Sequence, residues 1–178
     1  MAHIKLPEYE QMSPSIQKKA EPILKKSGKL GDIFRLLAID ENIYNSTDVM
    51  VQNYLLKETR LPYYIKEAIA LLISKENSCK MCVEVHKSIA KMLGLTQEEI
   101  EKILQGIETL EGDEKVKELL AFCIRASKKD NYKITKEEIN RVKSFGWSDE
   151  ELLEAVAITA YFNYINTLSN VFGLGDDQ

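Results

Sequence analysis

The stretch "LPYYIKEAIALLISKENSCKMCVEVH", residues 61–86, decides the fold class, because its apolar residues recur at the spacing of an α-helix. Ile65, Ile69 and Leu72 follow the helical period after Pro62, a residue that suits the first turn of a helix. The apolar part is short for a membrane span and carries charged residues. It therefore predicts a helix that is buried in a protein core.

Helical patterns continue along the rest of the chain, and the alternation of β-branched residues that marks strands is almost absent. A first helix is predicted over roughly residues 15–26, with Ser13 as its N-cap. A hydroxyl residue followed three positions later by glutamate forms a capping box that starts a helix. Such pairs occur at Thr96 and Glu99, Thr135 and Glu138, and Ser148 and Glu151. We therefore predict a single all-α domain.

Two segments of the chain echo each other, "GLTQEEIEKIL" at residues 94–104 and "GWSDEELLEAV" at residues 146–156. Each has a glycine, a hydroxyl cap, paired acids and an apolar stripe. One interpretation is that the same capping chemistry starts two independent helices. The other is that a helical unit has been duplicated, and the sequence leaves both open.

The composition excludes several classes of function. The chain has 178 residues, of which 44% are hydrophobic and 29% charged, values typical of a soluble globular protein. Its net charge of −4 implies no basic surface for nucleic acid. No apolar run is long enough for a membrane span, and the start lacks the apolar core of a signal peptide, so we expect a cytoplasmic protein. In a reducing cytosol, closely spaced thiols are more often catalytic, redox-active or metal-binding than structural.

The candidate site is "NSCKMCVEVH", residues 77–86, which holds two of the three cysteines and one of the two histidines. Cys79, Cys82 and His86 stand at i, i+3 and i+7, so on a helix they share one face. With Asn77 or Ser78 as the N-cap, Cys79 is expected in the first turn. There the unpaired backbone N–H groups and the helix dipole stabilise a thiolate.

Redox chemistry is one function that this spacing favours. A C-x-x-C pair lets one thiol resolve an oxidised partner into a disulfide with little backbone movement. His86 follows Cys82 by four residues and can take the thiol proton and return it to a leaving group.

Two other interpretations compete with a redox site. The cysteines could be ordinary core residues, since cysteine is often buried. Alternatively, two thiolates and an imidazole could supply three ligands to zinc, completed by Glu67 or by another subunit. Cys123 is expected on an apolar helix face and His3 in a flexible terminus, so both are weaker ligand candidates.

Glu67 is the carboxylate that could complete the redox set. It is either a partly exposed acid beside Lys66 or a group held near the cysteine helix, where it would orient His86 or accept its proton. Spacing does not choose between these roles, because a helix break intervenes. Glu76 competes for the role, whereas Glu84 is expected on a solvated face.

The four residues Glu67, Cys79, Cys82 and His86 form the pattern E-x11-C-x2-C-x3-H, which resembles the signature of the alkyl hydroperoxidase D (AhpD)-like proteins. These proteins share a superfamily with carboxymuconolactone decarboxylase. The resemblance extends over about residues 30–175, including the closing "LLEAVAITAYFNYINTLSNVFGL", which is similar to the peroxidase-related branch. It implies an AhpD-like domain over residues 31–178, preceded by an N-terminal extension or helix at residues 1–30.

The resemblance also implies a function. It implies a peroxidase without a prosthetic group, assembled as trimers or hexamers. In that scheme Cys82 attacks the hydroperoxide, Cys79 resolves the sulfenic acid as a disulfide, and Glu67 with His86 relays protons. The reductant would be an external dithiol, on a lipoyl-bearing or thioredoxin-like protein. Met81 stands where the well-studied peroxidases have a histidine of the relay.

Overall fold

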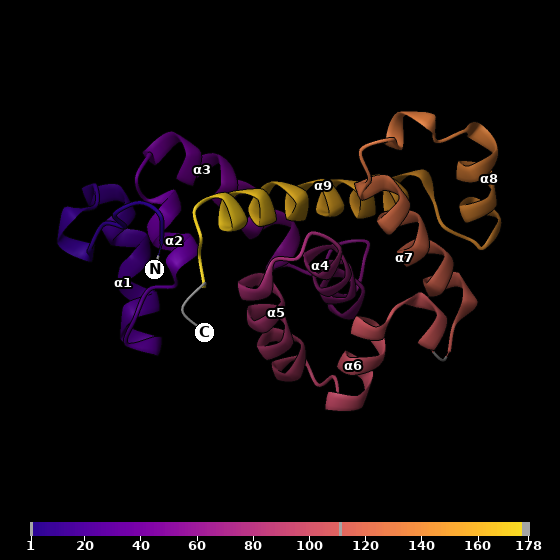
Figure 1. Ribbon diagram of the computed structural model, residues 1–178, viewed down its shortest axis with the longest axis horizontal. Helices are drawn as coiled ribbons and strands as arrows, with labels where there is room; N and C mark the ends of the chain where they lie inside the picture. Colours follow the sequence, from indigo (N-terminus) through magenta and orange to yellow (C-terminus); the bar gives the residue numbers. More distant parts are fainter. Residues whose placement is uncertain (1, 111, 176–178) are drawn as a thin grey trace. The chain divides into compact units, whose positions relative to one another are not determined.

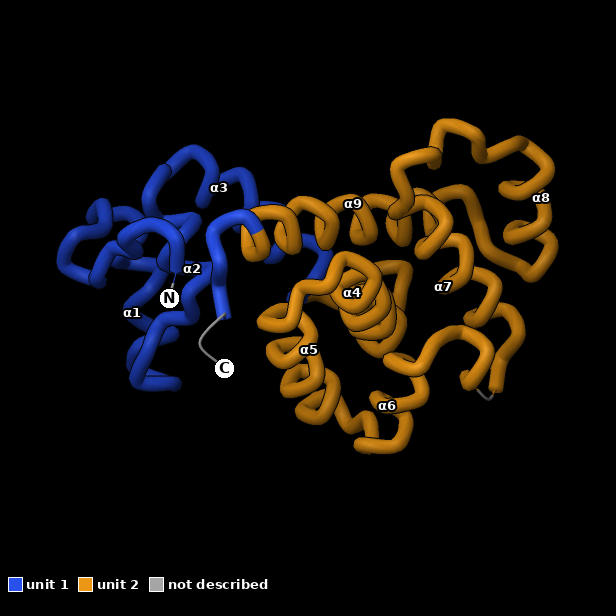
Figure 2. The backbone as a smooth tube through the Cα atoms, viewed as in Figure 1, with its two compact units in different colours: residues 1–56, 171–178 blue, residues 57–170 orange. Residues whose placement is uncertain are grey.

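The computed structural model describes residues 2–110 and 112–175, and in these residues the chain forms nine α-helices and no strand. The prediction of an all-α fold is confirmed. The chain divides into two compact units, Met1–Leu56 with Val171–Gln178, and Lys57–Asn170 (Figure 2). These units have other bounds than the expected family domain at residues 31–178, and the limits of that domain stay a prediction.

The first unit contains three helices: α1 (Pro14–Ser27), α2 (Asp32–Leu37) and α3 (Glu41–Met50), which continues as a π-helical segment, Val51–Leu55. Ser13 caps α1 as predicted, because its hydroxyl accepts a hydrogen bond from the backbone of Ile16. The rings of Phe34 and Tyr44 pack edge to face with centroids 5.0 Å apart. Aromatic packing thus joins α2 to α3.

The second unit is built around one buried helix. It contains α4 (Tyr63–Glu76), α5 (Lys80–Met92), α6 (Gln97–Gln105), α7 (Glu114–Ser127), α8 (Lys136–Ser144) and α9 (Asp149–Val171). Every residue from Ile65 to Ser74 is buried, and α4 contacts α5, α6 and α7, which surround it in Figure 1. This confirms the expected core helix. Among the described residues, no helix combines the length and apolarity that crossing a membrane requires.

The three capping boxes form as predicted at the starts of α6, α8 and α9. At α6, for example, the Glu99 amide donates to the Thr96 hydroxyl over 3.2 Å, and the Thr96 amide donates to the Glu99 carboxylate over 2.7 Å. The two echoing segments therefore share their capping chemistry. However, α6 has 9 residues and α9 has 23, and a duplicated unit stays a prediction.

A buried ionic cluster fixes the segment that leads into α4. The Lys66 ammonium, on a residue 1% exposed, donates to the backbone oxygen of Lys57 over 2.8 Å and to the Thr59 hydroxyl over 2.5 Å. Thr59 in turn donates to the Glu154 carboxylate of α9, which lies 3.7 Å from the ammonium. Burial lowers the pKa of Lys66, while the neighbouring carboxylate opposes that shift. The cluster joins the start of α4 to α9.

Candidate active site

Cys79 and Cys82 are joined by a disulfide at the start of α5, with Cα atoms 5.3 Å apart. Both residues are buried, with 1% and 3% of their surfaces exposed. Cys79 is itself the N-cap of α5, so the expectation that it lies in the first turn behind an Asn77 or Ser78 cap is wrong. The helix ends at Met92.

The physical reason for this shift is that α4 uses the two residues that were expected to cap α5. Ser78 has a φ of 55°, in the left-handed region, and its amide donates to the Lys75 oxygen over 2.9 Å. The Cys79 amide donates to the Ser74 oxygen over 2.8 Å. These two bonds form the Schellman motif that commonly ends a helix, here with serine in the position that glycine usually takes. The end of α4 therefore fixes the backbone of Cys79.

Glu67 and His86 contact each other across the two helices. The carboxylate Oε2 of Glu67 lies 2.7 Å from Nδ1 of His86, and their side chains are 11% and 14% exposed. The imidazole also packs edge to face on Phe162 of α9, with ring centroids 4.9 Å apart. The structure thus places Glu67 beside the cysteine helix, in contact with the imidazole.

The chemistry of the oxidised site follows from this geometry. A carboxylate on Nδ1 leaves Nε2 as the ring nitrogen that can exchange a proton with another group. Among the hydrogen bonds of the described residues, none joins His86 to either sulfur. His86 follows Cys82 by one helical turn on the same face of α5. It is therefore the base next to the Cys82 sulfur along this helix once the disulfide is reduced.

The other candidate residues lie outside this constellation. Glu84 is exposed and pairs with Lys87, as expected, and Glu76 pairs with Lys128. Cys123 is buried as expected, and burial raises the pKa of its thiol to about 12.

His3 was expected in a flexible terminus, but its amide donates to the Phe172 oxygen over 2.8 Å in the first unit. Within residues 2–110 and 112–175, no three histidine, cysteine or acidic side chains cluster in a way that could hold a metal ion. The described residues therefore offer no preformed set of ligands for zinc.

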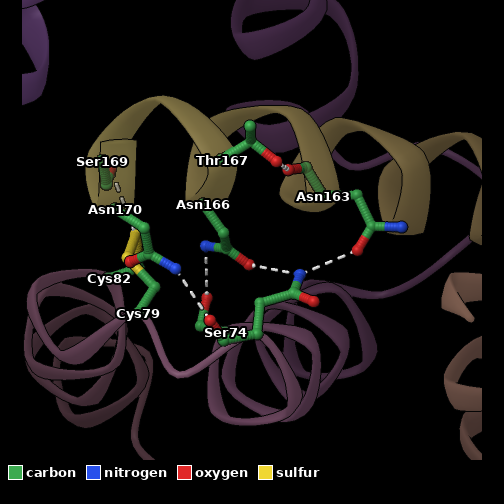
Figure 3. Close-up of a disulfide and its surroundings, with 9 residues drawn as sticks. Ser74, Cys79, Cys82, Asn163, Asn166, Thr167, Ser169 and Asn170 are labelled. Carbon is green, nitrogen blue, oxygen red and sulfur yellow. Dashed lines mark hydrogen bonds between the residues drawn. A yellow bond between two sulfur atoms is a disulfide. The ribbon is translucent and has the colours of Figure 1, made fainter. Parts of the chain in front are cut away.

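Polar residues of α9 that we did not single out from the sequence cover the disulfide (Figure 3). Cys82 Sγ lies 3.5 Å from the Ser169 hydroxyl. Asn163, Asn166 and Asn170 form hydrogen bonds with Asn77 at the turn between α4 and α5. The signal that could have revealed them is their spacing of i, i+3 and i+7, which puts three asparagines on one face of the helix.

The geometry defines a class of protein, an all-α protein with a dithiol–disulfide centre and an adjacent carboxylate–imidazole pair. Comparison with known proteins supports a family. Residues 49–124 match the carboxymuconolactone decarboxylase family. No curated protein sequence matches the chain.

Several solved structures share the fold. An uncharacterised peroxidase-related protein from Ralstonia eutropha, described as an alkylhydroperoxidase AhpD core, is 20% identical, with a TM-score of 0.88 over 97% of this chain and 90% of that chain. A peroxidase-related protein from a Silicibacter species is also 20% identical, with a TM-score of 0.87 and the same coverage. The debrominase Bmp8, in complex with 2,3,4-tribromopyrrole, is 17% identical, with a TM-score of 0.75 over 98% of this chain and 92% of that chain.

The family match thus covers residues 49–124 of the chain, and the fold is shared with AhpD-like, peroxidase-related proteins. At these identities the solved structures establish the fold alone. Because proteins of this fold include a debrominase as well as peroxidase-related proteins, the reaction has to be argued from the site.

Proposed function

We propose that the protein is a thiol-dependent hydroperoxide reductase in which Cys79 and Cys82 cycle between dithiol and disulfide. The observation that carries this proposal is the disulfide at the start of α5, in the same unit as the hydrogen-bonded pair of Glu67 and His86. A pair of thiols, a base and a carboxylate that orients the base are the groups that thiol-based peroxide reduction requires.

The oxidative half of the proposed cycle uses these groups in order. The Cys82 thiolate attacks the terminal oxygen of the hydroperoxide, the O–O bond breaks, and the leaving alkoxide takes a proton from His86 to become an alcohol. Cys82 is then a sulfenic acid. The Cys79 thiolate attacks the Cys82 sulfur, the S–O bond breaks, and hydroxide leaves as water after it takes a proton. Glu67 holds the imidazole in place throughout.

The reductive half requires an external dithiol, such as a lipoyl group on a carrier protein or a thioredoxin-like protein, and no prosthetic group. Such a cycle suits the cytoplasm, where thiol reductants are maintained. Val85 and Met92 of α5 and its C-cap Leu93 are apolar and 45%, 78% and 42% exposed, which suits a contact between copies of the chain. The homotrimer or homohexamer that the family resemblance implies is part of this proposal. Light scattering is expected to give a mass three or six times that of the 20.4 kDa chain.

The roles of the two cysteines are tested by trapping the sulfenic acid. The reduced Cys79→Ser variant is treated with cumene hydroperoxide and dimedone, and the modified peptide is identified by mass spectrometry. We expect one dimedone adduct, on Cys82, and no turnover of the Cys82→Ser variant with a dithiol reductant. Cys123→Ser is the matched control and should keep full turnover. Turnover by Cys82→Ser, or an adduct on another cysteine, would show that the assignment is wrong.

A second candidate function is redox sensing without efficient turnover, and the burial of the disulfide favours it. With 1% and 3% of Cys79 and Cys82 exposed, a protein reductant reaches neither sulfur without local movement. A sensor would form the disulfide with hydroperoxide but would be reduced by dithiols far more slowly than it is oxidised. Measuring the two half-reactions separately distinguishes a sensor from a reductase.

A further inference from the structure

A buried hydroxyl lies against one of the two disulfide sulfurs. Ser169 of α9 is 0% exposed, and its Oγ lies 3.5 Å from Sγ of Cys82 (Figure 3). A disulfide sulfur has no proton to donate, so the serine hydroxyl is the donor in this contact. The contact therefore concerns Cys82 alone, and it makes the two sulfurs of the bridge inequivalent.

Hydrogen bonds hold the helix that carries Ser169 in place. Asn166 donates to the Ser74 hydroxyl over 3.1 Å and accepts from the Asn77 amide over 3.0 Å. Asn170 donates to the backbone oxygen of Asn77 over 2.8 Å. These bonds connect α9, on both sides of Ser169, to the turn that precedes the cysteines. The hydroxyl is therefore fixed relative to Cys82 before any reaction occurs.

The charge on the sulfur decides how much this contact stabilises each redox state. A disulfide sulfur is a weak acceptor, whereas a thiolate is a charged and much stronger one. A fixed donor that points to the place where charge develops stabilises the charged state without further reorganisation. The Ser169 hydroxyl thus stabilises the Cys82 thiolate more than it stabilises the bridge.

We infer that Ser169 is a positioning residue that makes Cys82 the thiolate of the pair, both as the nucleophile and as the leaving group when the bridge is reduced. In that reduction, one thiolate of an external dithiol attacks Cys79 Sγ, the S–S bond breaks, and its electron pair goes to Cys82 Sγ beside the hydroxyl. The second thiolate of the reductant then attacks the mixed disulfide at the reductant's own sulfur. This releases Cys79 as a thiolate and the reductant as a disulfide. The inference rests on the proposed function for the identity of the reductant.

Other groups near Cys82 also titrate and have to be held constant in a test. They are Cys79 at the N-cap of α5, His86 on α5 and Glu67 on α4, while the residues of α9 drawn in Figure 3 carry no charge. Replacing Cys79 by serine leaves Cys82 as the reactive thiol, because Cys123 is buried and its pKa is raised to about 12. A change in thiol reactivity that follows from replacing Ser169 is then measured at Cys82 alone.

The experiment measures the rate at which iodoacetamide alkylates Cys82, as a function of pH, in Cys79→Ser and in Cys79→Ser/Ser169→Ala. We expect the midpoint of the pH profile to rise by about one to two pH units when the hydroxyl is removed, because hydrogen bonds to charged groups are among the strong ones. The plateau rate at high pH should change little. A merely structural role would alter the plateau without moving the midpoint.

The matched control is Thr159→Val in the same Cys79→Ser background. Thr159 is also a buried hydroxyl of α9, 1% exposed, but it donates to the backbone oxygen of Ala155 and not to a site sulfur. Its replacement should leave the midpoint unchanged. Ser169→Thr keeps a hydroxyl at the same place and should keep the midpoint near that of the parent. It also keeps the inference testable if the alanine variant folds poorly.

Two outcomes would overturn the inference. One is an unchanged midpoint in Ser169→Ala, and the other is an equal shift in Thr159→Val. Alkylation needs no hydroperoxide, so a shifted midpoint in a protein that does not reduce hydroperoxides would sustain the role of Ser169 while the proposed function fails. Normal peroxide turnover with an unchanged midpoint would instead sustain the proposed function and overturn the role of Ser169.

Discussion

Neutralising Glu67 tests the carboxylate–imidazole pair most sharply. In Glu67→Gln the side chain keeps its size and an acceptor oxygen, so the contact with Nδ1 of His86, 2.7 Å in the structure, can persist while the negative charge is lost. The two side chains are only 11% and 14% exposed, so solvent screens the charge weakly. A hydrogen bond to a charged group contributes about 1.5–3 kcal/mol. If the transition state loses about 2 kcal/mol of stabilisation, the reaction slows about 30-fold.

The assay is the rate of disulfide formation after rapid mixing of reduced protein with cumene hydroperoxide at pH 7, followed by acid quench and mass spectrometry. Glu84→Gln is the matched control, because it removes a carboxylate from α5 that is 57% exposed and pairs with Lys87. It should react at the rate of the unmodified protein. A Glu67→Gln rate within twofold of that rate, or an equal slowing in Glu84→Gln, would refute the relay.

Three further predictions concern the stability of the fold. Because burial raises the pKa of Cys123 to about 12, its contribution to stability is complete below about pH 9 and declines as pH rises toward 12. Between pH 9 and 11, the free energy of unfolding measured by chemical denaturation should therefore fall by about 1.4 kcal/mol per pH unit more in the unmodified protein than in Cys123→Ala. If both proteins lose stability equally with pH, burial of this thiol is not the cause. The Glu154→Gln variant leaves the buried ammonium of Lys66 without a carboxylate partner, so the free energy of unfolding of this variant should fall by about 3–5 kcal/mol. A fall of less than about 1 kcal/mol would show that the ion pair does not stabilise the fold. Ser78→Gly should raise the free energy of unfolding by about 1 kcal/mol, because glycine adopts the φ of 55° without strain, and a destabilised variant would speak against strain at this turn.

Features that depend on neighbouring residues could be predicted from the sequence. The capping boxes at Thr96, Thr135 and Ser148 each need one hydroxyl and one glutamate three residues apart, so their formation follows from local chemistry. The buried character of α4 followed from its apolar period. The start of α5 was missed because serine rarely occupies the left-handed position that ends a helix, so Ser78 gave no sign of that turn.

Features that depend on packing between distant segments could not be predicted with the same certainty. The contact between Glu67 and His86 was one of two open interpretations, since their helices are separated by a turn whose geometry the spacing does not define. The hydroxyl of Ser169 lies 87 residues beyond Cys82 in the chain and reaches it only because α9 packs over the disulfide. No local pattern encodes that approach, although the stripe of asparagines on α9 marks the face that makes it.

The most direct test of the central claim is a single turnover of the fully reduced protein with one equivalent of cumene hydroperoxide. We expect one equivalent of alcohol per chain and one intramolecular disulfide between Cys79 and Cys82, with Cys123 still reduced. Subsequent addition of a dithiol should restore both thiols. If the hydroperoxide is recovered unchanged while both thiols stay reduced, the protein is not a hydroperoxide reductase and the central claim is contradicted.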